Sequence, residues 1–275
     1  MKPLLSIIVP CYNQAQYLDE CLQSVYNQTF QDWECIIVND GSPDHTEQVA
    51  QSWVLKNDRF SYLYSENKGV SNARNIGIEK AKGQFILPLD ADDKISNEYT
   101  TLAINEFQVD KELTLVYCKA KKFGGINEDW ILDDFSIQKL AIDNMIFCSA
   151  IYKKTDWEKV GGYDINMVTG LEDWEFWISL LKDNAKVVKL DVFGFFYRIK
   201  VNSRQKNLHI LEKKDLFKYI SVKHAGFFVD NLGSFMHLSY QIEQLQSNHY
   251  KNVNDKKKAL KIFLKNFFGI NFFKK

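Results

Sequence analysis

The chain is predicted to form an α/β fold with a mostly parallel sheet flanked by helices. Four runs typical of short β-strands occupy residues 4–9, 34–38, 60–64 and 85–89. Between them apolar residues recur every three or four positions, as at Leu18, Leu22 and Val25, which indicates amphipathic helices. Because strand–helix–strand connections are right-handed crossovers, strands that alternate with helices form a parallel sheet.

Composition and charge restrict the class of protein. Of the 275 residues, 45% are hydrophobic and 25% are charged, which are values of globular proteins. The formal net charge is zero, but residues 251–275 carry eight lysines against the single acid Asp255, so the first 250 residues are acidic. A nucleic-acid-binding domain carries a basic stripe across its folded part, and we therefore expect no nucleic-acid partner.

The cysteines and the start of the chain favour a cytoplasmic protein. The five cysteines show no C-x-x-C spacing, so we expect reduced thiols in the core. The apolar run within residues 1–10 is too short for a signal peptide. No apolar run approaches the roughly 18 residues that a membrane-spanning helix needs.

Three carboxylates follow the fourth predicted strand, at Asp90, Asp92 and Asp93. A buried strand rarely ends in so much negative charge without a cation to face it. Asp90 and Asp92 occupy alternate positions, so both side chains can reach one point beyond the strand end. Such oxygen ligands suit Mg²⁺ or Mn²⁺, which are often shared with substrate phosphates. On these residues alone, a solvated acidic turn in which Asp93 caps the next helix explains the pattern equally well.

Polar and aromatic residues also follow the first two strands. Tyr12 and Asn13 come after the first, and Asn39 and Asp40 come after the second. Ligands of parallel α/β sheets bind at the carboxyl ends of the strands, so these groups are suitably placed for a nucleotide. Asn13 is also expected to cap the helix that follows.

Four short motifs therefore stand in order on successive strand ends: Ser6-Ile-Ile-Val-Pro-Cys-Tyr-Asn13, Ile37-Val-Asn-Asp-Gly-Ser42, Asn67-Lys-Gly69 with Ala73-Arg-Asn-Ile-Gly77, and Leu89-Asp-Ala-Asp-Asp93. Each is weak alone, but the ordered set resembles the family 2 glycosyltransferases. The pairs Glu172-Asp173 and Tyr197-Arg198 extend the resemblance over roughly residues 4–207. It implies a GT-A (Rossmann-like) catalytic domain at 1–207 and a C-terminal helical extension at 208–275.

The resemblance assigns nucleotide contacts to the first two motifs. Tyr12 is expected to pack on the base, and Asp40 to accept from the uracil imide, which makes UDP the expected nucleotide. Pro10 of the first motif and Ala91 of the last are also expected to contact the donor. The alternatives are core packing for Tyr12 and an Asx-turn before Gly41 for Asp40.

The resemblance also assigns roles around the phosphates. Arg74, near a helix start, would approach the diphosphate or the base, and its alternative is a surface salt bridge. Asp90 and Asp92 would meet the donor ribose and a Mn²⁺ or Mg²⁺ ion, with Asp92 as the firmer metal contact.

Residues 170–177 lead into a helix on which Trp174 and Trp177 recur at core spacing, so they are expected in the core rather than as sugar platforms. Glu172 and Asp173 fall at the helix start, where carboxylates are favoured in any case. The resemblance implies that Asp173 is the general base of an inverting reaction, with Glu172 as the first alternative. Further strands are expected at 113–118, 147–152 and 193–197, and a loop at 124–135 with Trp130 could border the acceptor.

Many relatives carry Tyr-Arg-x-His-x-x-Ser in a segment that closes over the diphosphate. This chain has Tyr197 and Arg198 but Lys200 in place of the histidine. Arg198 and Lys200 are expected near the donor phosphates. A protonated lysine can offset phosphate charge but cannot bind a metal, and His209 is a poor substitute for the family histidine.

The resemblance therefore implies a metal-dependent hexosyl- or N-acetylhexosaminyltransferase. It would move a sugar from a nucleotide diphosphate donor to a hydroxyl of a glycan or lipid-linked acceptor, in surface polysaccharide or lipid-linked glycan synthesis. One alternative is a nucleotide-sugar-binding or scaffold protein without turnover, which the intact Asp92 and Asp173 disfavour. Another is a haloacid dehalogenase type of phosphotransferase, but its D-x-D pair follows the first strand rather than the fourth.

The last residues, 256–275, form a basic amphipathic pattern. Apolar residues recur at helical spacing on one face, and lysines do so on the other: Leu260, Phe263, Leu264 and Phe267 against Lys258, Lys261 and Lys265. This pattern is typical of a helix that lies in a membrane interface. It predicts peripheral attachment to an anionic membrane, at the inner face of the plasma membrane. The alternative is a helix docked on this protein or on a partner subunit.

Overall fold

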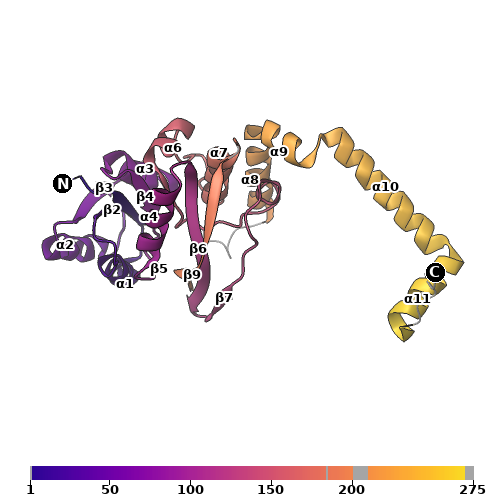
Figure 1. Ribbon diagram of the computed structural model, residues 1–275, viewed down its shortest axis with the longest axis horizontal. Helices are drawn as coiled ribbons and strands as arrows, with labels where there is room; N and C mark the ends of the chain where they lie inside the picture. The colour runs from indigo at the N-terminus through magenta and orange to yellow at the C-terminus, as the bar shows by residue number, and fades with distance from the viewer. Residues whose placement is uncertain (1, 184, 201–209, 270–275) are drawn as a thin grey trace. The chain divides into compact units, whose positions relative to one another are not determined.

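The computed structural model describes residues 2–183, 185–200 and 210–269 (Figure 1). The chain divides into two compact units, Met1–Ala225 and Gly226–Lys275. The predicted boundary between residues 207 and 208 lies outside the described residues. Helix α8 (Ile210–Lys223) belongs to the first unit.

A mixed sheet organises the first unit. Within the described residues it holds nine strands, in the order β3-β2-β1-β4-β8-β6-β9-β5 with β7 paired to β6. They are β1 (Leu5–Cys11), β2 (Trp33–Asp40), β3 (Phe60–Ser65), β4 (Phe85–Pro88), β5 (Lys94–Ile95), β6 (Leu113–Gly124), β7 (Glu128–Trp130), β8 (Ile151–Lys153) and β9 (Lys186–Ile199). The neighbours β3, β2, β1 and β4 are parallel, whereas β8 and β5 are antiparallel to the strands beside them. The predicted α/β fold is confirmed, with antiparallel strands added beyond β4.

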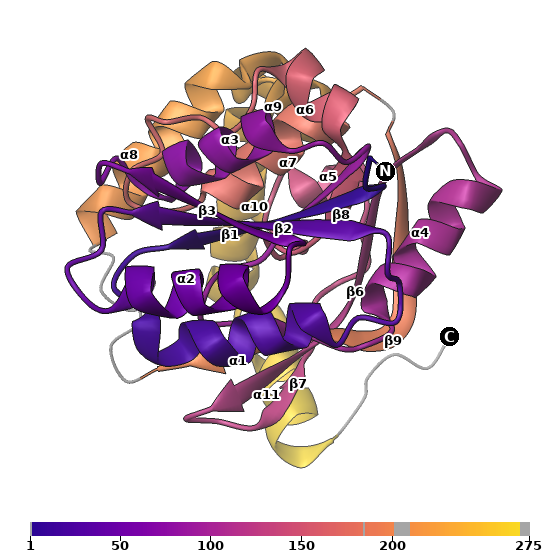
Figure 2. The same ribbon diagram turned by 90° about the vertical axis from the view of Figure 1, so that its left-hand side faces the viewer.

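Helices cover both faces of the β1–β3 region (Figure 2). Helices α1 (Ala15–Tyr26) and α2 (Thr46–Lys56) lie on one face, and α3 (Val70–Lys80) lies on the other. Gly77 lets α3 approach the sheet closely, because a Cβ there would lie 2.5 Å from Ile8 Cγ2. Every residue of β1 and β4 is buried. Burial of one such aliphatic side chain contributes about 1.5–3 kcal/mol, so these layers form the core that fixes the strand ends.

The remaining helices of the first unit before α8 are α4 (Tyr99–Val109), α5 (Ile137–Leu140), α6 (Lys154–Val160) and α7 (Glu172–Leu181). Helix α4 contacts β6 and β9. Helix α7 packs on β8, because the rings of Phe176 and Trp177 lie 5.2 and 5.8 Å from that of Tyr152. Trp174 and Trp177 are buried, which confirms their predicted place in the core.

Most predicted strands are confirmed, and the differences arise where pairing decides the boundary. Residues 113–118 belong to β6, which continues to Gly124 because it pairs with β7 and β9. Residues 193–197 likewise lie within the longer β9. Of the predicted strand 147–152, only the end from Ile151 pairs, as β8.

The predicted cap at Asn13 is wrong. Asn13 has a left-handed φ of 54°, and its N–H donates to Ser42 Oγ at 3.1 Å. The first N–H of α1, that of Ala15, donates instead to Asp44 Oδ2 at 2.9 Å. A carboxylate at a helix N-terminus is favoured by the helix dipole. The loops after β1 and β2 therefore stabilise each other, since their parallel strands are neighbours.

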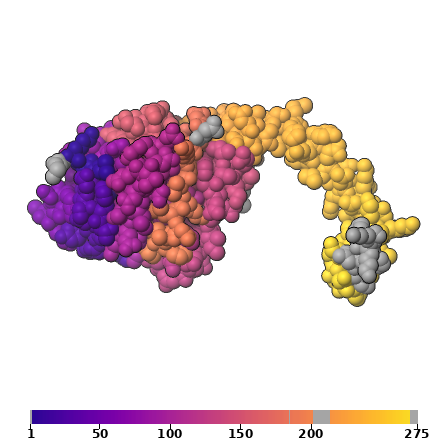
Figure 3. All heavy atoms as spheres, viewed as in Figure 1, coloured from indigo at the N-terminus to yellow at the C-terminus, as the bar shows by residue number. Residues whose placement is uncertain are grey.

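The second unit, which begins at Gly226, holds the rest of α9 (Ala225–Leu232), α10 (Phe235–Asn254) and α11 (Lys256–Phe268). It can be followed from orange to yellow in Figure 3. Asp255 caps α11, because its Oδ1 accepts from the N–H groups of Lys257 and Lys258 at 2.9 and 3.2 Å. Several large apolar side chains of these two helices are exposed: Phe235, Met236, Tyr240, Leu245, Leu260, Phe263, Phe267 and Phe268. Among the described residues, the structure contains no helix that is both long and apolar enough to span a membrane.

Candidate active site

A tight turn after β4 carries the three aspartates. The N–H of Asp93 donates to the carbonyl of Asp90 at 3.0 Å, which closes the turn. Asp93 does not cap a helix, because β5 follows it directly. Its buried Oδ1 accepts from the N–H of Arg198 at 2.8 Å, and its Oδ2 has no hydrogen-bond partner among the described residues. Burial and the charges of Asp92 and Asp90 raise the pKa of Asp93 well above its usual range.

Arg74 connects this turn to the predicted catalytic helix. Its Nη2 lies 2.7 Å from Asp90 Oδ1, and its Nη1 lies 3.2 Å from Glu172 Oε1. The Arg74 side chain is buried, so the alternative of a surface salt bridge is wrong. The guanidinium also lies 5.3 Å from the centre of the Tyr163 ring. Helix α3 thereby brings the carboxylates after β4 and those before α7 to one place.

Asp92 forms an ion pair with Lys200. The Lys200 ammonium also donates to Gln14 Oε1 at 3.2 Å. Arg198, two residues earlier, donates from Nε to the carbonyl of Asp92 at 2.7 Å. The end of β9 is thus attached to the acidic turn through the contacts of Arg198 and Lys200 with Asp92.

Asp173 lies in the first turn of α7. Leu171, the residue before the Glu172-Asp173 pair, has a left-handed φ of 62°, which is a costly conformation for a bulky side chain. Asp173 Oδ1 accepts from the N–H of Trp174 at 2.8 Å. Although Asp173 keeps some solvent access, the protein atoms around it and the charge of Glu172 raise its pKa to about 7. A carboxylate with a pKa near neutrality suits a general base.

The predicted nucleotide residues lie at the ends of β1 and β2. Tyr12 is 46% exposed, so the alternative of core packing is wrong. Asp40 is buried, and its two oxygens accept from the N–H groups of Lys68 and Gly69 at 3.1 and 2.8 Å. It therefore positions the loop before α3 rather than forming an Asx-turn. A carboxylate can accept about four hydrogen bonds, which leaves capacity for a further donor.

Three more predicted residues have clear places in the fold. Pro10 is buried within β1, and Ala91 is buried between the two aspartates of the turn. Trp130 lies on β7, and its ring is 5.0 Å from that of Tyr197 on β9. Residue His209 lies outside the described residues.

The acidic turn can supply oxygen ligands to a divalent cation. Ligand atoms of Asp90, Asp93 and Cys148 lie within 4.8 Å of one another. Burial and the charge of Asp90 raise the pKa of the Cys148 thiol, which donates to Asp90 Oδ2 at 3.6 Å. A protonated thiol is a poor ligand for Mg²⁺ or Mn²⁺, whereas carboxylate oxygens suit both ions. The Oδ2 atom of Asp93, which has no hydrogen-bond partner among the described residues, is available as a further ligand. The ligands offered to the ion are therefore carboxylate oxygens.

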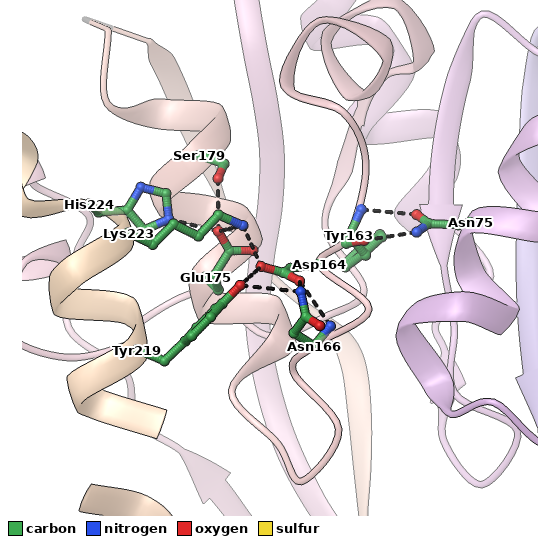
Figure 4. A network of polar contacts seen from close by, with 9 residues as sticks. All are labelled: Asn75, Tyr163, Asp164, Asn166, Glu175, Ser179, Tyr219, Lys223 and His224. Carbon is green, nitrogen blue, oxygen red and sulfur yellow. Dashed lines mark hydrogen bonds and ion pairs between the residues drawn. The ribbon is translucent and has the colours of Figure 1, made fainter. Parts of the chain in front are cut away.

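Sequence reasoning missed a network of charged and polar residues around Glu175 of α7 (Figure 4). Glu175 Oε1 lies 2.8 Å from Lys223 Nζ and 2.7 Å from His224 Nε2. Lys223 Nζ and the hydroxyl of Tyr219 also contact Asp164 Oδ2, at 2.5 and 2.8 Å. The network fixes α8 to α7 and to the loop that precedes it. Its sequence signal was the acid Glu175 within an otherwise apolar helical segment.

Asn75 of α3 holds the same loop from the other side, as Figure 4 shows. Its Oδ1 accepts from the N–H of Tyr163 at 2.9 Å, and its Nδ2 donates to the Tyr163 carbonyl at 2.8 Å. The side chain of Asn75 thereby binds both backbone hydrogen-bonding groups of Tyr163. The segment that leads to Asp173 is thus fixed by α3 and α8 together.

Acids at strand ends beside a carboxylate at a helix start suit a transferase that acts on a nucleotide-linked donor. Residues 6–169 match the sequence model of the Glycosyl transferase family 2, which covers more than half of the chain. The chain therefore belongs to the family 2 glycosyltransferases, and the predicted family is confirmed.

Curated relatives agree with this assignment. The chain is 28% identical over 237 residues to the putative teichuronic acid biosynthesis glycosyltransferase TuaG of Bacillus subtilis. This match covers 82% of the chain and 91% of TuaG. It is 42% identical over 97 residues to the uncharacterized glycosyltransferase EpsJ of the same organism. That match covers 35% of this chain and only 28% of EpsJ. A match to GlyG of Streptococcus pneumoniae, at 33% identity over 150 residues, covers 53% of this chain and 50% of that relative.

Solved structures show the GT-A fold. TarS 1–349 of S. aureus in complex with UDP-GlcNAc superposes with a TM-score of 0.69 at 18% identity, over 83% of this chain and 71% of that one. The mannosyltransferase PcManGT of Pyrobaculum calidifontis, in complex with GDP-Man and Mn²⁺, gives 0.62 at 15% identity, over 94% and 83%. The predicted GT-A architecture is confirmed.

Proposed function

We propose that this glycosyltransferase moves a hexosyl or N-acetylhexosaminyl group from a UDP-sugar to an acceptor hydroxyl, with inversion and with a divalent metal ion. The observation that carries the proposal is the position of Asp173. Its carboxylate has a pKa of about 7 and stands beside Glu172, whose partner Arg74 also binds Asp90 of the acidic turn. Base and donor groups therefore share one site.

Asp173 performs the proton transfer in this proposal. It accepts the proton of the acceptor hydroxyl while that oxygen attacks the anomeric carbon. The bond from this carbon to the diphosphate oxygen breaks on the opposite side, so the configuration inverts. The buried Arg74 pairs with both Asp90 and Glu172, and so keeps the acidic turn and the start of α7 in place during the step.

The donor groups bind and orient the nucleotide. Tyr12 offers an exposed ring for the base, and Asp40 offers an acceptor for the uracil imide. In this proposal the donor also contacts Pro10 and Ala91, and its ribose contacts Asp90. The proposal of UDP is supported by the TarS complexes with UDP and UDP-GlcNAc, whereas PcManGT was solved with GDP-Man.

Asp92 and Asp90 would hold Mn²⁺ or Mg²⁺, with the unpartnered oxygen of Asp93 close by. When bound, the ion supplies charge neutralisation of the diphosphate leaving group. Arg198 fixes the carbonyl of Asp92 and so orients the turn toward the phosphates.

The proposed acceptor is a glycan or a lipid-linked glycan of a bacterial surface polysaccharide. The teichuronic acid assignment of TuaG supports this class, and the chondroitin synthase of Pasteurella multocida, 31% identical over 185 residues but matched over 19% of its length, also concerns a polysaccharide. Mass spectrometry of products from a panel of nucleotide sugars with lipid-linked acceptors tests the proposal. We expect one sugar to be added from a UDP donor. Donor binding without transfer or hydrolysis in Mn²⁺ would instead favour a binding or scaffold protein.

We also propose that α11 attaches the protein to an anionic membrane, at the cytoplasmic face of the plasma membrane. The helix carries five lysines and no acid, and it exposes Leu260, Phe263, Phe267 and Phe268. Positive charge beside exposed apolar side chains complements an anionic leaflet, at about 1 kcal/mol for each lysine near its surface. Attachment would bring the enzyme to a lipid-linked acceptor. Residues 270–275, which continue the pattern, lie outside the described residues.

A further inference from the structure

Each of the first two aspartates of the acidic turn already faces a cation of the protein itself. Asp90 is paired with Arg74 at 2.7 Å, and Asp92 is paired with Lys200. The side chains of Lys200 and Asp92 are only 19% and 18% exposed. A charge pair that is mostly withdrawn from water is weakly screened by salt, so this pair affects whatever else binds Asp92.

The fold builds the position of Lys200. Arg198 is held by two hydrogen bonds to the turn, from its N–H to Asp93 Oδ1 and from its Nε to the Asp92 carbonyl. Its guanidinium lies 4.5 Å from the centre of the Tyr17 ring. Lys200 follows directly after β9, and its ammonium lies 5.4 Å from the same ring. The contacts at the end of β9 therefore place the Lys200 ammonium beside Asp92.

A divalent cation and this ammonium need the same carboxylate. A metal ion that binds Asp92 competes with Lys200, because two cations at one carboxylate repel each other strongly where the groups are mostly withdrawn from water. A displaced ammonium without a new anionic partner costs free energy, which lowers the affinity for the metal alone. A nucleoside diphosphate brings such an anion, since its phosphate oxygens accept from ammonium groups.

We infer, on the basis of the proposed function, that Lys200 is an internal cation that makes the divalent metal and the nucleoside diphosphate bind cooperatively. Without nucleotide it occupies Asp92 and competes with the metal. When both ligands bind, the metal takes Asp92 and Lys200 moves to the diphosphate. By linkage, each ligand raises the affinity for the other by the same factor.

Isothermal titration calorimetry of the full chain with Mn²⁺, with and without saturating UDP, measures this coupling. For the natural sequence we expect UDP to tighten Mn²⁺ at least about fivefold, the lower end of typical coupling. In Lys200→Met, Mn²⁺ alone should bind at least about fivefold tighter, because Asp92 has lost its competitor. UDP should then tighten Mn²⁺ less than it does in the natural sequence, because only the direct attraction between the metal and the diphosphate remains. Lys200→Arg, which keeps the charge, should retain the coupling.

Lys189→Met is the matched control. Lys189 is similarly buried, with 22% of its side chain exposed, and pairs with Asp134 at 2.8 Å at the other end of β9. It should bind Mn²⁺ and UDP like the natural sequence. Circular dichroism checks the fold of every variant, and Lys200→Gln is a second neutral variant should Lys200→Met not fold.

The outcomes separate this inference from the proposed function. Equal Mn²⁺ affinity in the natural sequence and in both neutral variants, with UDP still bound, overturns the role of Lys200 and leaves the proposed function standing. Loss of the coupling in Lys189→Met also overturns it, since the effect would not be specific to Asp92. Failure of the natural sequence to bind either Mn²⁺ or UDP overturns both.

Discussion

The acidic turn and the C-terminal helices handle charge in opposite ways. At the turn, Asp90 and Asp92 are paired with Arg74 and Lys200, which come from distant parts of the chain. On α11, five lysines and several phenylalanines are exposed to solvent, with no acid in the same helix. The first arrangement balances its negative charge with cations of the same chain, and we propose that it binds a metal ion together with a diphosphate. The second places five lysines on the surface of one helix, and we propose that it binds an anionic membrane.

The largest effect is expected from Asp92→Asn, which removes the charge of the turn's central carboxylate. Turnover should fall below detection, and UDP binding in Mn²⁺ should weaken, because the proposed metal contact is lost. Steady-state kinetics and calorimetry measure the two effects. Removal of divalent metal with EDTA should have the same result in the natural sequence. Full activity in EDTA would contradict the metal role of the turn.

A smaller but clear effect on membrane binding is expected from removal of α11. A chain that ends at Asn254 lacks all five lysines of α11, each worth about 1 kcal/mol at an anionic surface. The full chain should sediment with anionic vesicles, less so in high salt, and the shortened chain should stay in the supernatant. UDP binding should be the same in both. If both chains sediment alike, α11 is a packing or assembly element instead.

The smallest effect concerns the choice of nucleotide. At a concentration of 100 times its Kd, UDP should stabilise the protein by about 2.7 kcal/mol, which corresponds to roughly 5–10 °C in Tm for a domain of this size. GDP and CMP should shift Tm less, because Asp40 is proposed to accept from the uracil imide. Thermal unfolding with the three nucleotides decides this. Equal shifts would remove the specificity role of Asp40.

The sequence located the strand ends correctly because the patterns that define them are local. Alternating strands and helices place Tyr12, Asp40 and Asp90 at one edge of a parallel sheet, and the structure agrees. The cap of α1 could not be found in this way, because it comes from Asp44 in the next loop rather than from Asn13. Such a partner depends on which strands become neighbours.

The same reason explains what sequence reasoning missed around the site. The alternative in which Asp93 caps a helix is wrong, because Asp93 binds the backbone of Arg198, 105 residues later. Glu175 finds Lys223 and His224 only after α8 returns to α7. The pairing of Lys200 with Asp92 likewise requires β9 to lie beside β5. Long-range pairs leave no periodic trace in the chain.

The role of Asp173 is the central claim, and the pH dependence of kcat/KM tests it most directly. A base acts when deprotonated, so the rate should rise with pH through about 7, the raised pKa of Asp173, and then level off. Asp173→Asn should keep UDP affinity, lower turnover at least ~10²-fold and abolish that rise. Glu172→Gln should keep the rise but move its midpoint to lower pH, because the charge of Glu172 helps to raise the pKa of Asp173. An active Asp173→Asn enzyme with an unchanged pH profile would contradict the account and transfer the role to another residue, with Glu172 first.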